Sequence, residues 1–198
     1  MLRFTSGAAF LACVLALSAG PAEAQFPLRI LGGPTISNVS TDEYDTSSKV
    51  GFFAAVGTSF ALSESVAVSP FLGFVQKGAE FSDETQDTYS YIEIPVLLGT
   101  QIPVGENASI SLSAGPQVAF NINCDEEGYD CSEYDNHKST EFGFVAGAGI
   151  GFPLTDPYDL SFGVSFDFGL TDVFDEMDGG YKNRVIYIWG SIGTVLGG

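Results

Sequence analysis

Apolar and polar residues alternate along most of this 198-residue chain, and the clearest example is YIEIPVLLG at residues 91–99. Successive side chains of a β-strand point to opposite sides, so this pattern predicts a strand with two different faces. One face holds Tyr91, Glu93 and Pro95. The other face is wholly apolar and consists of Ile92, Ile94, Val96 and Leu98.

Eight such runs follow one another, and no segment after the N-terminus has a convincing helical pattern. The runs lie near residues 28–37, 50–62, 66–77, 91–102, 109–120, 142–152, 160–170 and 184–196. The eighth run is apolar on both faces, so alternation does not assign its facing. Short connections alternate with long ones: the short ones are 63–65, 104–107 and 155–157, and the long ones are 39–48, 78–90, 121–140 and 171–183. This order predicts an all-β, antiparallel up-and-down barrel of eight strands, with both termini at the short-turn rim.

The composition of the two faces indicates a membrane barrel. In the fifth to seventh runs one face carries Phe, Leu and Ile, whereas the other carries Gly, Ser, Gln and Asp. An eight-stranded barrel has an interior just wide enough for side chains, so small polar groups suit the lumen and the large apolar face meets lipid. The alternative is a soluble, lipocalin-like lipid-binding barrel. Its ligand pocket would be lined by Phe144, Phe162 and Phe166.

The N-terminus predicts export. Arg3 is followed by an apolar segment at 8–17 and by Ala22-Glu23-Ala24, which has the form of a signal-peptide cleavage site. The domains expected are therefore a signal peptide at 1–24 and a barrel at 25–198. The chain has a net charge of −18, and 17 of its 25 acidic residues lie in the four long connections. Nucleic acid is therefore excluded as a partner. A monomer in contact with outer-membrane lipid, lipopolysaccharide and a surface or envelope protein is expected.

The stretch at 91–98 resembles the Y-(I/L)-E-(I/L)-P-(L/V)-L-L pattern of the outer membrane protein beta-barrel domain family, often labelled porin-family or PorT-like. Further similarities are Gly32-Gly33, Ser37-Asn38 and Lys77-Gly78. The resemblance implies an eight-stranded barrel of OmpA- or OmpX-like form in the outer membrane of a Gram-negative-type bacterium, with periplasmic termini and no shared activity. One departure is the final TVLGG, where such barrels commonly end on an aromatic residue.

Polar residues on the lumen face are the first candidate site. Glu93 is expected to point into the lumen, where an unpaired carboxylate is costly. Lys77, Arg184 or Arg29 could neutralise it. Gln117 and Asp167 lie on the same face. The group is either a polar gate or a structural ion pair between strands, and we favour the ion pair.

The longest connection carries the remaining candidates. Cys124 and Cys131 are expected to form a disulfide in an oxidising compartment. Thiolate metal ligation would need further ligands, and His137 is the only histidine of the chain. The cluster Asp125, Glu126, Glu127 and Asp130 is a weak calcium candidate, because it lacks the spacing of an EF-hand loop.

No enzyme activity and no cofactor are expected. A serine nucleophile needs a base, and His137 has only Ser132 and Ser139 nearby, without a glycine-elbow motif. Three roles remain: a structural or surface-interaction protein acting through acidic extracellular loops, a narrow small-solute porin, and an accessory subunit of a secretion complex.

Overall fold

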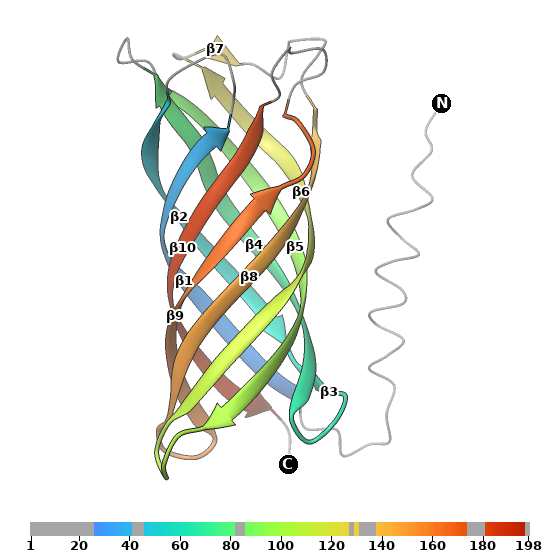
Figure 1. The fold of residues 1–198 in the computed structure, drawn as a ribbon, viewed down its shortest axis with the longest axis vertical. Coiled ribbons are helices and arrows are strands. Elements are labelled where there is room, and N and C mark those ends of the chain that lie inside the picture. The colour runs from blue at the N-terminus through green and yellow to red at the C-terminus, as the bar shows by residue number, and fades with distance from the viewer. Residues whose placement is uncertain are drawn as a thin grey trace.

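The structure is a computed structural model that describes residues 26–40, 46–81, 86–126, 129–130, 138–173 and 181–196. It is a closed antiparallel barrel of strongly tilted strands (Figure 1). Its strands are β1 (Phe26–Ser40), β2 (Thr46–Thr58), β3 (Phe60–Ala61), β4 (Val66–Phe81), β5 (Gln86–Pro103), β6 (Ser109–Glu126), β7 (Tyr129–Asp130), β8 (Thr140–Pro153), β9 (Tyr158–Gly169) and β10 (Lys182–Leu196). Among these residues, no helix is long and apolar enough to cross a membrane.

Eight long strands make the wall, in the order β2-β1-β10-β9-β8-β6-β5-β4, and pairing of β2 with β4 closes it. The short β3 continues along β4 beyond β2, and β7 pairs with the end of β6. Phe26 at the start of β1 pairs with Leu196 at the end of β10, so the first and last strands meet at one rim. Figure 1 shows this short-turn rim at the bottom and the opposite loop rim at the top. The predicted fold class is confirmed.

The strands reach farther toward the loop rim than the sequence predicts. We expected connections at 78–90 and 121–140, but β4 runs to Phe81, β5 begins at Gln86 and β6 continues to Glu126. The prediction ended each strand where its apolar face ended. Backbone pairing does not need that face: Asp87 pairs with Ala79 on one side and with Glu126 on the other. Several acidic residues assigned to loops therefore stand in the barrel wall.

The large apolar side chains point outward. Phe142 is 55% exposed, and Phe144, Phe162 and Phe166 are exposed as well. These rings therefore do not line a pocket, and the soluble lipocalin-like alternative is wrong. The outer surface also carries exposed Val50, Phe52, Leu72, Leu98, Leu112, Phe120, Ile150, Phe168, Ile188 and Ile192. This apolar surface is what lipid contact requires.

The structure settles the facing of β10. Asn183, Val185, Tyr187 and Ser191 are buried, whereas Ile188 and Ile192 are exposed. The residues with odd numbers thus face the interior. Alternation could not assign this strand because Val185 and Tyr187 are as apolar as the residues that face outward.

Candidate functional site

A single lysine occupies the middle of the lumen. Lys77 points inward from β4 and is 1% exposed. Its Nζ lies 2.7 Å from Glu93 Oε1, 3.0 Å from Glu141 Oε1 and 2.8 Å from Asp167 Oδ2. An ammonium group has three donor hydrogens, which matches these three acceptors. The four residues, here called the Lys77 cluster, come from β4, β5, β8 and β9 and so join strands from different parts of the wall.

Neighbouring side chains hold two of the three carboxylates, Glu93 and Glu141, in place. Tyr187 Oη donates a hydrogen bond of 2.9 Å to Glu93 Oε2, and Asn183 Nδ2 donates one of 2.5 Å to Glu141 Oε2. Gln117 Nε2 donates a long one of 3.5 Å to Glu93 Oε1. Gly143 leaves room beside the cluster, because a Cβ there would lie 2.8 Å from Asp167 Oδ1. Buried charges need such partners, since an unpaired ion in a dry interior is strongly destabilising.

A second polar layer lies between the Lys77 cluster and the loop rim. The hydroxyl groups of Tyr89 and Tyr181 each donate a 3.0 Å hydrogen bond to Asp87 Oδ2. All three residues are buried, and Tyr89 has no exposed surface. The two layers together place bonded side chains across the lumen in the loop-rim half of the barrel.

The sequence identified part of this arrangement. Glu93, Lys77, Gln117 and Asp167 are all buried in the lumen, and Lys77 neutralises Glu93. The two alternative partners of Glu93 lie elsewhere. Arg29 pairs with Asp159 at 2.6 Å, and Arg184 lies 5.8 Å from the ring of Phe168 and donates to the carbonyl of Gly169.

Sequence reasoning missed Glu141, Asn183 and Tyr187. Glu141 directly precedes the predicted run that starts at Phe142. Extending that alternation by one residue would have placed it on the lumen face, beside Gly143.

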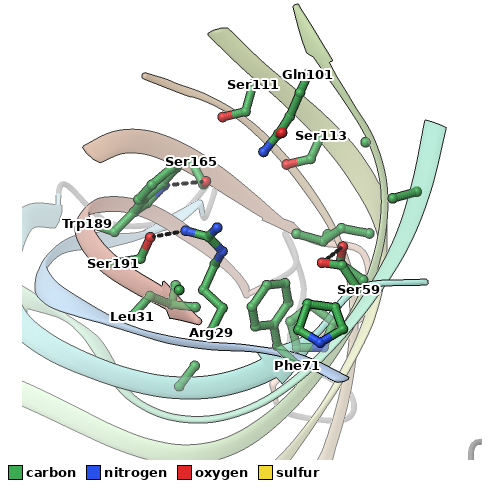
Figure 2. A pocket seen from close by; sticks show the side chains of 18 of the residues that line it. Arg29, Leu31, Ser59, Phe71, Gln101, Ser111, Ser113, Ser165, Trp189 and Ser191 are labelled. Carbon is green, nitrogen blue, oxygen red and sulfur yellow. Dashed lines mark hydrogen bonds between the residues drawn. The ribbon is translucent and has the colours of Figure 1, made fainter. Parts of the chain in front are cut away.

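The half of the lumen toward the short-turn rim is hollow. It contains an inner cavity with a volume of about 460 Å³. The lining reaches from Ser63 and Glu64 in the turn before β4 up to Glu93, Gln117 and Tyr187 at the Lys77 cluster. The cavity therefore opens at the short-turn rim and ends at the cluster. Figure 2 shows Arg29, Phe71 and Trp189 around it.

Two aromatic rings stand against glycines in the cavity wall. A Cβ at Gly149 or Gly163 would lie within 2.4 Å of the Trp189 ring, and one at Gly57 would lie 2.1 Å from Phe71 Cδ1. Glycine at these positions is what lets the rings approach the strands this closely. Trp189 Nε1 also donates a 3.0 Å hydrogen bond to Ser165 Oγ (Figure 2), which fixes its orientation.

Arg29 is the cationic group of the cavity lining. Its Nη2 donates to Asp159 Oδ1, and its Nη1 donates to Ser191 Oγ at 2.9 Å and to Ser161 Oγ at 3.2 Å. The guanidinium is therefore both neutralised and held in one position.

The comparisons with known proteins identify the family. A model of the outer membrane protein beta-barrel domain matches residues 23–175. The chain belongs to this family. Membership in this family places the protein in an outer membrane. It agrees with the resemblance noted at residues 91–98. No curated protein matches it.

Solved structures share the fold of this outer membrane barrel. Neisserial surface protein A (NspA) is similar with a TM-score of 0.62 and 14% identity, over 85% of this chain and 96% of that one. OprG from Pseudomonas aeruginosa is similar with a TM-score of 0.51 and 11% identity, over 89% and 99%. AlkL is similar with a TM-score of 0.50 and 13% identity, over 90% and 94%. At these identities the likeness shows the fold alone.

The other candidates come from the longest predicted connection, which the structure describes only in part. Cys124 in β6 is disulfide-bonded, and its expected partner Cys131 lies outside the described residues. The backbone of Asp125 in β6 pairs with that of Asp130 in β7. Glu127 and His137 lie outside the described residues. Within the described part of the chain, no group of three or more His, Cys, Asp or Glu residues is placed to hold a metal ion.

Proposed function

We propose that this protein is a sealed outer-membrane barrel that acts at the cell surface, as a structural or interaction protein, without conducting solutes and without catalysis. The observation that carries the proposal is the Lys77 cluster. A pore needs a water-filled path along its axis, but Lys77 and its three carboxylate partners are buried and bonded to one another in mid-lumen. The Asp87, Tyr89 and Tyr181 layer lies in the same path.

The charge distribution supports a role at the surface. The loop rim, taken as the strand ends and connections at 39–48, 78–90, 121–140 and 171–183, holds 17 of the 25 acidic residues of a chain whose net charge is −18. We propose that this rim faces the cell exterior of a Gram-negative-type bacterium, and that the short-turn rim and both ends of the mature chain face the periplasm after removal of residues 1–24. The proposed partners are lipopolysaccharide and a surface or envelope protein, bound by a monomeric barrel.

A conductance measurement tests the sealed lumen. Refolded protein, shown to be folded by a gel-mobility difference between unboiled and boiled samples, is added to a planar bilayer. We expect no discrete conductance steps. Regular steps from wild-type protein would refute the sealed barrel and favour the small-solute porin.

A loop replacement tests the surface role. Replacing residues 131–137 by a Gly-Ser linker of equal length, together with Cys124→Ser, removes acids and the disulfide from the longest connection. The control carries Cys124→Ser alone. We expect both variants to keep the gel-mobility difference. We expect only the loop replacement to lose the binding of lipopolysaccharide, or of a surface protein, to intact cells that carry the barrel. Equal binding by both variants would contradict a role for this connection. Co-purification with secretion components instead would favour the accessory-subunit role.

A further inference from the structure

We propose that the inner cavity binds a small uncharged molecule that has an apolar body and a hydroxyl or carbonyl group. This site lies on the far side of the Lys77 cluster from the acidic rim, so it is independent of the surface role proposed above. It also does not depend on the direction of insertion.

The shape of the cavity suits a small molecule. Its volume of about 460 Å³ falls within the range of about 300–1,000 Å³ that is usual for small-molecule sites. It is open at the short-turn rim and closed by Glu93, Gln117 and Tyr187 at the other end. A molecule can therefore enter and leave by the same opening, and it cannot pass through the barrel.

The walls provide apolar contact on two sides. Leu31, Phe71, Leu97 and Trp189 line the cavity. The Trp189 ring is fixed by the hydrogen bond to Ser165, and glycines behind it leave its face free toward the cavity. Rigid aromatic walls favour an apolar ligand, because burying its surface brings no ordering cost from the protein side.

The polar groups of the lining select against a charged ligand. The Arg29 guanidinium is already paired with Asp159 at 2.6 Å, and Glu64 adds a further acid at the opening. An anionic ligand would have to compete for Arg29 and would face the acids. The hydroxyl groups of Ser111 and Ser113 also line the cavity (Figure 2). They suit an uncharged hydrogen-bonding group.

Trp189 is the only tryptophan of the chain, so its fluorescence reports on the cavity directly. The probe is 6-bromo-1-hexanol, an uncharged alcohol whose bromine quenches tryptophan. Refolded protein in detergent is titrated with the probe. We expect quenching that saturates, and we expect 1-hexanol to restore the fluorescence by competition. The anion 6-bromohexanoate should bind about tenfold more weakly or worse, because burying a carboxylate without a free cationic partner is costly.

Two variants on β6 provide the matched test. Ser113→Phe places a ring inside the cavity, whereas Ala114→Phe places the same ring on the outer surface. We expect Ser113→Phe to abolish the saturable quenching and Ala114→Phe to retain it, with the gel-mobility difference intact in both. Quenching of wild-type protein that rises linearly without saturation, or that 1-hexanol does not reverse, would overturn the proposal even if Ser113→Phe failed to fold. Saturable quenching that is equal in the two variants would overturn it as well.

Discussion

Replacing Lys77 by methionine removes the charge on which the lumen depends. The substitution keeps a side chain of similar length but leaves Glu93, Glu141 and Asp167 buried without their common cation. Removing one partner of a buried ion pair costs about 3–5 kcal/mol, and here three carboxylates lose theirs. At about 2 kcal/mol per molar urea, the midpoint of unfolding should fall by about 2 M.

Urea unfolding in lipid vesicles, followed by Trp189 fluorescence, measures this loss. The control is Lys182→Met, the same chemical change at the half-buried first residue of β10, which should alter the free energy of unfolding by no more than about 0.5 kcal/mol. Adding Glu93→Gln, Glu141→Gln and Asp167→Asn to Lys77→Met should recover most of the loss, because amides can bond to one another without a cation. A Lys77→Met protein as stable as the Lys182→Met control would refute the reasoning. So would a neutralised variant no more stable than Lys77→Met.

Three further substitutions test other parts of the barrel. Val164→Arg places a charge in the middle of the outward face of β9 and should cost about 2–4 kcal/mol of folding free energy in vesicles. The control Tyr158→Arg, at the strand end, should cost about 1 kcal/mol or less. Equal costs would contradict lipid contact at Val164. Gly163→Val should displace the Trp189 ring, shift its emission and cost about 1–3 kcal/mol by overpacking; an unchanged emission spectrum would contradict the close approach. Gly78→Ala should destabilise the barrel by about 1–3 kcal/mol in the same urea assay, since Gly78 has a φ of +143° and a Cβ would lie 1.9 Å from the Asp87 carbonyl oxygen.

Alternation predicted the wall of the barrel because the two faces differ in chemistry. Where large apolar residues alternate with Gly and Ser, as on β8 and β9, every predicted facing agrees with the structure. The signal failed where that contrast is lost. On β10 the interior residues Val185 and Tyr187 are apolar, and near the loop rim β5 and β6 extend through polar segments on both faces.

The lumen was predictable only in part for a related reason. Glu93 and Asp167 stand out as acids within apolar runs, so their burial could be inferred from the strand pattern. Their shared bond to one lysine could not, because it depends on which strands face each other across the closed barrel. The inner cavity left no pattern in the sequence either. It arises where Gly, Ser and Ala from several strands happen to leave space between Phe71 and Trp189.

The Lys77 cluster has a consequence for how the chain folds. Its hydrogen bonds join residues 64 and 90 positions apart, far more than the separation between paired residues of a hairpin. Contacts of such long range form late, since the cost of closing the intervening chain must be met first. An open sheet that lacks the β2–β4 pairing would keep Glu93 on the strand next to Lys77, but it would leave Glu141 and Asp167 three and four strands away. The complete cluster therefore forms only in the curled barrel. Its bonds across the lumen stabilise the closed form relative to an open sheet.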